Sequence, residues 1–246
     1  LVNDYNRRGD MIGRSARLPT VVVRPGEPNA ATTGIFSGIV REPINGLNVT
    51  SPLPLNLKHS VTSARTAIGS MLTLHDMNED DFTSRVFHSM KKTATVDRGV
   101  NVHSVTTTPG ELYECAKSLS SSAPSFPSVN VEENDDLINI VQSMPSMMTA
   151  NVANLLHLPG ENDTASSLVQ HYIDDFVHGN GVSLKNNKEN EKEGLVVGFV
   201  GIGNMGKGMV VNLLKNGNIG GNGNIKHMKL YNRTRDKVDA LLHEWK

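Results

Sequence analysis

Residues 194–206 read Gly194-Leu195-Val196-Val197-Gly198-Phe199-Val200-Gly201-Ile202-Gly203-Asn204-Met205-Gly206. An apolar run rich in valine passes directly into a glycine-rich turn, and a segment with helical periodicity follows. A strand, such a turn and a helix in this order are typical of a dinucleotide-binding unit. The glycines allow a sharp turn, close approach to a pyrophosphate and tight helix packing, and the helix start offers free N–H groups. The pattern predicts a cofactor site at Gly201, Ile202, Gly203, Asn204, Met205 and Gly206.

The residues after the next predicted strand bear on which nicotinamide cofactor binds. That strand is expected at residues 226–231, and Asn232, Arg233 and Thr234 follow it. An acidic residue here would accept a hydrogen bond from the 2′-hydroxyl of NAD, but none occurs before Asp236. Arg233 instead offers a forked donor for a 2′-phosphate, and its two neighbours can add hydrogen bonds. The sequence thus favours NADP over NAD, with an ordinary surface arginine as the alternative.

The composition excludes several classes of protein. The chain has 246 residues, a net charge of −1 and no basic run longer than a pair, so nothing indicates nucleic-acid binding. No apolar run approaches membrane-spanning length, and we expect any targeting segment to lie upstream of Leu1. Cys115 is the single cysteine, which excludes an intrachain disulfide and fits a reducing, cytoplasmic compartment.

A change in composition divides the chain into parts. Residues 179–194 are dominated by Gly, Asn, Lys and Glu and cannot bury enough apolar surface to offset the entropy of ordering them. We therefore expect a flexible linker at 179–194, between a first domain at 1–178 and a second at 195–246.

Apolar periodicity and turn residues predict an α/β pattern in the first domain. Helices are expected at residues 1–9, 31–41, 63–75, 108–119, 137–144 and 164–177, and strands at 16–23, 100–105 and 129–131. Pro19 interrupts the first strand, the helix at 31–41 should stop before Pro43, and Thr108 with Glu111 should form a capping box. Residues 78–99 are polar and predict no element.

The helices carry apolar stripes, which are most simply explained as faces packed on the core. Along residues 63–75 the stripe consists of Ala64, Ala67, Ile68, Met71 and Leu72.

The C-terminal motifs resemble a known family. Residues 198–206, Asn212-Leu213-Leu214 and Tyr231-Asn232-Arg233-Thr234 are similar to the start of the β-hydroxyacid dehydrogenases, which include 3-hydroxyisobutyrate and L-threonate dehydrogenases and are related to 6-phosphogluconate dehydrogenase. The resemblance covers only about residues 195–246, and Asn218–Asn224 is an insertion relative to the family. It implies that the family's catalytic lysine and substrate-binding motif would come after Lys246, so no catalytic residue is assigned within the chain.

The N-terminal block resembles a different group. The similarity is to the C-terminal half of the D-erythronate dehydrogenases, which are extended short-chain dehydrogenases related to sugar-nucleotide epimerases. The segments that carry it are residues 1–5, 17–26, 41–43 and 63–65, and more loosely 172–175. The resemblance implies that the cofactor domain and its Tyr-x-x-x-Lys pair lie upstream of Leu1. It also implies that Arg24 and Arg65 contact a hydroxy-acid carboxylate, and a structural ion pair is an equal alternative for either.

Two further patterns could indicate sites. Tyr113 and Lys117 have the Tyr-x-x-x-Lys spacing on a predicted helix, but no glycine-rich turn precedes them, and an ordinary helix is favoured. The histidines show no spacing typical of metal ligands, so no metal site is expected.

The resemblances together suggest an α/β chain that fuses pieces of two enzymes. It would consist of the incomplete substrate-side part of an extended short-chain dehydrogenase, followed by a partial Rossmann βαβ unit. The expected function is that of an NADP-binding hydroxyacid dehydrogenase acting, in a longer protein, on small sugar acids such as erythronate or threonate. An inactive remnant or interaction module, and an NAD-dependent epimerase of nucleotide sugars, are the alternatives. The expected partners are the cofactor, a hydroxy acid and possible further copies of the chain, without nucleic acid or membrane.

Overall fold

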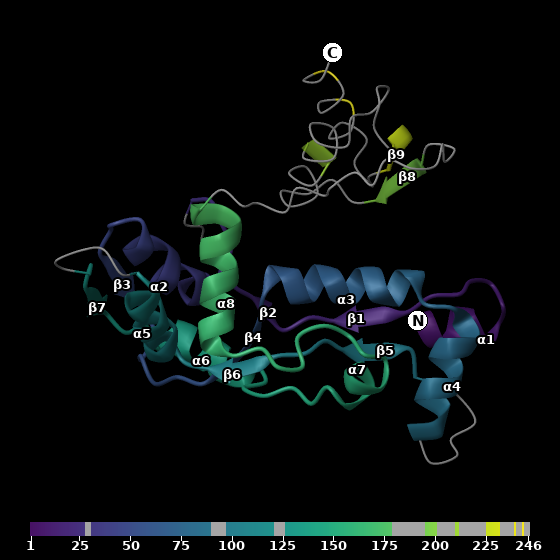
Figure 1. The fold of residues 1–246 in the computed structure, drawn as a ribbon, viewed down its shortest axis with the longest axis horizontal. Helices are drawn as coiled ribbons and strands as arrows, with labels where there is room; N and C mark the ends of the chain where they lie inside the picture. Colours follow the sequence, from purple (N-terminus) through teal and green to yellow (C-terminus); the bar gives the residue numbers. More distant parts are fainter. Residues whose placement is uncertain are drawn as a thin grey trace. The chain divides into compact units, whose positions relative to one another are not determined.

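The computed structural model describes residues 1–27, 31–89, 97–120, 126–178, 195–200, 210–211 and 225–231, together with Asp239 and His243. The chain divides into two compact units, Leu1–Ser183 and Leu184–Lys246. Figure 1 shows the elements of each unit. Both contain parallel strand pairs and the first also contains helices, so the mixed α/β class expected from the sequence is confirmed. The linker expected at 179–194 lies outside the described residues.

The described strands of the first unit form three small sheets. β1 (Ser15–Arg17) pairs in parallel with β5 (Gly99–Asn101), and β3 (Val49–Ser51) pairs in parallel with β7 (Val129–Val131). β4 (His59–Thr62) lies between β2 (Thr20–Val21), which is parallel to it, and β6 (Val105–Thr107), which is antiparallel.

Two strands expected to be continuous are each divided between two sheets. The strand expected at 16–23 becomes β1 and β2, because Pro19 has no N–H to donate and lies between them. The strand expected at 100–105 likewise divides into β5 and β6. The alternation of apolar residues along the sequence therefore predicts which segments are extended, but it does not predict which strands pair with one another.

The helices of the first unit follow local start signals closely. Their bounds are α1 (Val2–Arg7), α2 (Ile35–Ile44), α3 (Ala64–Asp76), α4 (Glu79–Ser89), α5 (Pro109–Leu119), α6 (Asp135–Ser143), α7 (Asn151–Leu155) and α8 (Ala165–Tyr172), which continues as a π-helix at Ile173–Val177. The capping box of Thr108 and Glu111 is formed at the start of α5, as predicted. Residues 78–99 contain α4, which the sequence did not predict.

The helix α2 differs from the expectation at both ends. It begins at Ile35 rather than near Ala31, and it continues through Pro43 to Ile44. A proline in the last turn removes only one backbone donor from the helix. The end is then closed by Asn45, whose N–H donates to the carbonyls of Arg41 and Glu42, and by Gly46 at φ +80°.

The core of the first unit has two clusters. The larger contains Phe36, Ile39 and Val40 of α2 together with residues of α5, α6 and α8, and α5 contacts both α2 and α8. The smaller joins α4 and α7 to β5 through Phe82, Val86, Val100 and Ala153. The larger cluster also contains Val22 and Val23, so it packs α2 against the segment that precedes it.

The apolar stripe predicted along α3 faces the core only in part: Ala67 is buried as expected, but the prediction was wrong for the three large side chains of the stripe. Ile68, Met71 and Leu72 are 54%, 43% and 57% exposed. The buried positions are instead Thr66, Ala67, Ser70 and Leu74. Periodicity identifies one apolar face of a helix, but it does not determine which surface lies against that face.

A charged cluster joins the start of α4 to the residues that directly precede β1 and β5. The Glu79 carboxylate accepts hydrogen bonds from Arg98 and, at 3.0 Å, from Arg14. The guanidinium carbons of Arg14 and Arg98 lie 4.7 and 5.6 Å from the centre of the Phe82 ring. The hydrogen bond from Arg98 is the main cause that lowers the pKa of Glu79 to about 2.

This cluster makes stability depend on pH in acid. Because the folded pKa of Glu79 is depressed below the ordinary glutamate value of 4.5, its contribution to stability is full above pH 4.5 and is lost as the pH falls towards about 2. We expect Glu79→Gln to lower the free energy of unfolding at pH 7 by about 2 kcal/mol. The difference between wild type and variant, measured by urea denaturation, should disappear between pH 4.5 and about 2. A difference that is constant over this range would contradict the account.

The second unit contains one parallel strand pair among its described residues. β8 (Leu195–Val200) pairs with β9 (Ile225–Tyr231), and the register brings the last residues, Val200 and Tyr231, opposite each other. Both strands lie where the sequence predicted them. Within the described ranges, no helix is long and apolar enough to cross a membrane.

Candidate functional site

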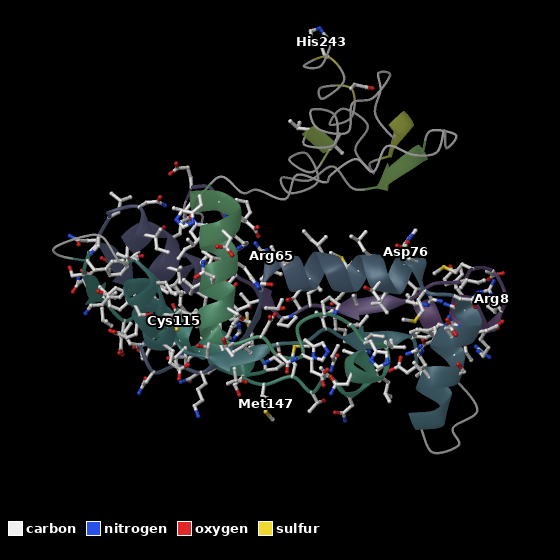
Figure 2. All side chains as sticks on the ribbon, in the orientation of Figure 1. Arg8, Arg65, Asp76, Cys115, Met147 and His243 are labelled. Carbon is white, nitrogen blue, oxygen red and sulfur yellow. The ribbon has the colours of Figure 1, made fainter. Side chains whose placement is uncertain are left out.

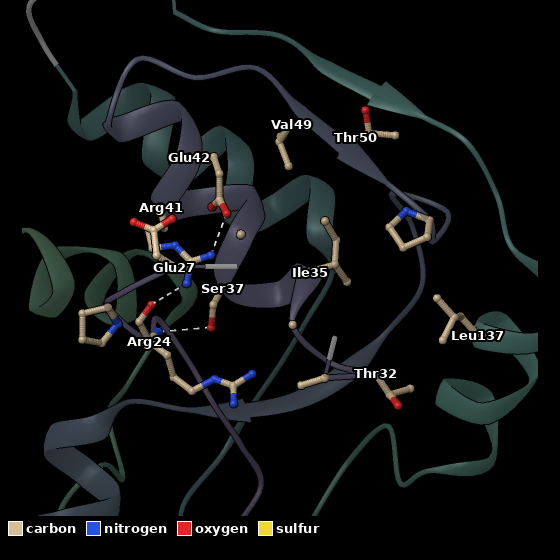
Figure 3. A pocket seen from close by; sticks show the side chains of 15 residues that line it. Arg24, Glu27, Thr32, Ile35, Ser37, Arg41, Glu42, Val49, Thr50 and Leu137 are labelled. Carbon is tan, nitrogen blue, oxygen red and sulfur yellow. Dashed lines mark hydrogen bonds and ion pairs between the residues drawn. The ribbon is translucent and has the colours of Figure 1, made fainter. Parts of the chain in front are cut away.

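A cavity of about 490 Å³ opens beside α2 in the first unit. Its walls come from the loop before α2, from α2 itself, from β3 and from Leu137 of α6 (Figure 3). The polar or charged side chains that line it are Arg24, Glu27, Thr32, Ser37, Arg41, Glu42 and Thr50. This volume lies in the range typical of small-molecule sites.

The backbone of Arg24 is held from both sides by α2. Its N–H donates to Ser37 Oγ at 3.1 Å, and its carbonyl accepts from Arg41 Nη1 at 2.9 Å. Ser37 and Arg41 are four residues apart, so they lie on the same face of the helix. The loop that carries Arg24 is therefore fixed against α2.

The Arg24 side chain lines the cavity and has no hydrogen bond or ion pair with a residue of the described part of the chain. A guanidinium in this position can bind a carboxylate or a phosphate through two parallel hydrogen bonds. Of the two arginines indicated by sequence resemblance, Arg24 is the one placed in the cavity.

Arg65 has a different environment. It lies in the first turn of α3, and its guanidinium binds the buried Asp175 through two hydrogen bonds of 2.8 and 2.5 Å. The hydrogen bonds that Arg65, labelled in Figure 2, donates to Asp175 are the main cause that raises the pKa of Arg65. Asp174 lies 3.8 Å away as a second partner. Arg65 does not line the cavity beside α2, so the two arginines are not brought together.

The other polar groups considered from the sequence have structural partners. The Tyr113 hydroxyl donates to the carbonyl of Pro127 at 2.8 Å and packs beside Phe126, so it serves to dock α5. Burial raises the pKa of the Cys115 thiol, with Glu111 and Glu114 adding to the shift. Within the described residues, no group of three His, Cys, Asp or Glu side chains could hold a metal ion.

The residues predicted to bind the cofactor lie outside the described part of the chain. They are Gly201, Ile202, Gly203, Asn204, Met205, Gly206, Asn232, Arg233 and Thr234. The strands that precede them are described, and these strands end side by side with Val200 opposite Tyr231. Val200 and Tyr231 therefore end at the same edge of a parallel pair, the edge at which dinucleotides bind in open α/β sheets.

Sequence reasoning missed Glu42 and its neighbours in the cavity. Glu42 Oε1 accepts from Arg41 Nη2 at 2.6 Å, while Oε2 is buried without a hydrogen-bond partner among the described residues. In the sequence, Arg41 and Glu42 contribute only to the resemblance to the D-erythronate dehydrogenases. The position of this pair beside the loop at Arg24 depends on how α2 packs against that loop, and no local sequence pattern predicts this packing.

The C-terminal part of the chain matches a known protein family. Residues 196–245 match the NAD binding domain of 6-phosphogluconate dehydrogenase. This match covers only the C-terminal part of the chain, and it supports the resemblance found in the glycine-rich turn.

The chain is also similar to dehydrogenases and epimerases of another kind. D-erythronate dehydrogenase of Cupriavidus necator is 29% identical over 176 residues, which cover 71% of this chain and 50% of the relative. The structure of a nucleoside-diphosphate-sugar epimerase from Agrobacterium tumefaciens superimposes with a TM-score of 0.61 and 27% identity, covering 72% of this chain and 48% of that one. A GalE-like L-threonine dehydrogenase from Cupriavidus necator shares the fold, with a TM-score of 0.56 and 16% identity over 69% of this chain and 50% of that one.

The chain thus spans about half the length of the relatives it matches. A match of 176 residues is longer than the second unit, so it must fall mainly in the first. The two units therefore resemble two different groups of proteins, as the sequence motifs indicated.

Proposed function

We propose that the chain belongs to an NADP-dependent oxidoreductase of the hydroxyacid dehydrogenase type, in which residues 195–246 bind the cofactor. One observation carries the proposal: β8 and β9 are parallel and end with Val200 opposite Tyr231, and the residues that follow these two positions in the sequence are the ones predicted to bind the cofactor. The match of residues 196–245 to an NAD-binding domain supports the same assignment. The residues would bind as predicted, with the turn at the pyrophosphate and Arg233 at the 2′-phosphate.

The first unit would supply a substrate-side part for small sugar acids such as erythronate or threonate. Two observations support this part of the proposal: the similarity to D-erythronate dehydrogenase, and the Arg24 side chain, which lines a cavity of suitable volume and has no hydrogen bond or ion pair with a described residue. The two units would then be pieces of two dehydrogenases fused in a longer protein. We further propose that the protein acts in the cytoplasm, on the basis of its single cysteine, and that it associates with further copies of itself.

The cofactor assignment can be tested by fluorescence titration of the chain with NADPH and NADH. We expect saturable NADPH binding and weaker NADH binding. Arg233→Met should weaken NADPH binding about tenfold, because it removes the charged donor to the 2′-phosphate, and should leave NADH binding unchanged. Lys229→Met, a substitution of another cationic residue in the same unit, serves as the control. Equal losses for both nucleotides would contradict the role given to Arg233.

An NAD-dependent epimerase of nucleotide sugars is the second candidate, because the Agrobacterium tumefaciens structure with 27% identity is described as a nucleoside-diphosphate-sugar epimerase. The two functions differ in the ligand of the first unit. Calorimetry with UDP-glucose and D-erythronate separates them, since tighter binding of the nucleotide sugar would favour the epimerase. Failure of every nucleotide and acid to bind would favour an inactive remnant or interaction module.

A further inference from the structure

The exposed face of α3 has the pattern of a helix that packs against a second helix. Its exposed positions follow one another at alternating spacings of three and four residues: Arg65, Ile68, Leu72 and His75. Met71 is exposed beside Leu72, whereas the opposite face of the helix is buried in the unit. Such spacings place side chains along one seam of a helix. We call these five residues the α3 seam.

The seam continues into a groove at the C-terminal end of α3. The groove has a volume of about 670 Å³, and Met71 and Leu74 of the helix form one of its walls. Ile12, from the segment that leads into β1, forms another wall and is largely exposed. Arg14 also lines the groove, but its guanidinium is already bound to Glu79 at 3.0 Å. The groove therefore offers an open apolar surface whose arginine has its counter-ion within the chain.

The other end of the seam carries an exposed aromatic side chain. Arg65 binds the Asp175 carboxylate, and Phe176 follows directly in the π-helix that continues α8. Phe176 is about half exposed, and it lines a small cavity together with Arg65, so it lies beside the start of α3. In the view of Figure 1, α8 crosses this end of α3 and extends beyond it. The seam thus has a protruding ring at one end and a groove at the other.

This face suits a second copy of itself. A two-fold interface brings the same patch of both copies together, so the patch must complement itself. Antiparallel pairing places the protruding end of each copy at the groove of the other, and it also opposes the two helix dipoles. A standard interface takes about 800 Å² from each partner, and exposed apolar patches of this kind mark interaction sites. The exposed apolar side chains available here are Ile12, Ile68, Met71, Leu72 and Phe176.

We propose that the α3 seam joins two copies of the chain in a two-fold symmetric dimer with antiparallel α3 helices. Ile68 of each copy packs against Leu72 of the other. Phe176 of each copy enters the groove of the other and contacts Ile12 there. The inference rests on the association of copies given with the proposed function, and it adds the surface through which they meet.

Sedimentation equilibrium of the full chain measures this dimer, and we expect a reversible monomer–dimer equilibrium. Leu72→Asp should raise the dissociation constant at least about a hundredfold, because dimerisation would bury an unpaired carboxylate in each copy. Leu47→Asp is the matched control: Leu47 is 58% exposed against 57% for Leu72, but it lies after α2 and should leave the dimer unchanged. Unfolding is measured at concentrations at which the chain is monomeric, where both variants should keep the stability of the wild type.

A double-mutant cycle tests the antiparallel orientation. Phe176 and Ile12 lie at opposite ends of α3 within one copy, so effects confined to single copies would add. In the proposed dimer the two side chains meet across the interface. Phe176→Ala and Ile12→Ala should each raise the dissociation constant about tenfold, and the double variant should also raise it only about tenfold, since both changes remove the same contact. Circular dichroism checks that each variant retains its helices.

A dimer that Leu72→Asp weakens no more than Leu47→Asp would overturn the role of the seam, because the copies would then meet through another surface. An effect of about a hundredfold in the double variant would overturn the antiparallel arrangement. A chain that stays monomeric but binds NADPH would overturn the dimer, assign the α3 face to a different polypeptide and leave the cofactor proposal standing. A dimer of the predicted kind that fails to bind NADPH would have the opposite meaning.

Discussion

Replacing Phe36 by alanine should lower the free energy of unfolding of the first unit by about 4 kcal/mol. The ring is fully buried in the larger core cluster, and it stacks on His59 with the ring centres 4.7 Å apart. The substitution leaves a cavity between α2 and β4, which cannot close without moving the helix that carries the candidate site. Urea denaturation followed by circular dichroism measures the change.

The matched control for this prediction is Ile68→Ala in α3. This side chain is 54% exposed, so its truncation should change stability by no more than about 0.5 kcal/mol. A large loss at Ile68, or a loss below about 1 kcal/mol at Phe36, would contradict the core as described.

The second large effect is expected at Arg65. Arg65→Met leaves the Asp175 carboxylate, which is 8% exposed, without its two hydrogen bonds. An uncompensated buried charge is strongly destabilising, and the partial exposure of Arg65 reduces the expected loss to about 2 kcal/mol. The affinity for acids should not change, because Arg65 does not line the cavity beside α2.

Asp174→Asn is the control for Arg65→Met. Asp174 lies 3.8 Å from the same guanidinium without a hydrogen bond to it, so its neutralisation should cost little. If Arg65→Met weakened D-erythronate binding as much as Arg24→Met does, Arg65 would be a ligand contact rather than a structural residue.

Local chemistry explains what could be predicted from the sequence. The capping box at Thr108 and Glu111 involves residues three apart, and it forms as expected. The strands β8 and β9 were predictable because each is a continuous extended run bounded by glycine-rich or polar segments. Arg24 was proposed from family resemblance, and the structure places it in a cavity.

The features that escaped prediction depend on contacts between distant segments. The exposed face of α3 has the same periodicity as a buried one, so only packing distinguishes them. Glu79 accepts hydrogen bonds from Arg14 and Arg98. Arg14 is far from Glu79 in the sequence, and the segment between Glu79 and Arg98 has no recognisable sequence pattern. The proximity of Glu42 to the loop of Arg24 depends on how α2 packs against that loop, which no local sequence pattern predicts.

The central claim is that residues 195–246 bind NADP at the edge where β8 and β9 end. The most direct measurement is a titration of the isotope-labelled chain with NADPH, followed through backbone amide signals. We expect the signals of Val200 and Tyr231 to shift saturably, because these residues end the paired strands next to the glycine-rich turn. The signals of Phe36 and Val61, which lie in the core of the first unit, should remain in place. Shifts confined to the first unit, or no saturable shift at Val200 and Tyr231, would contradict the claim.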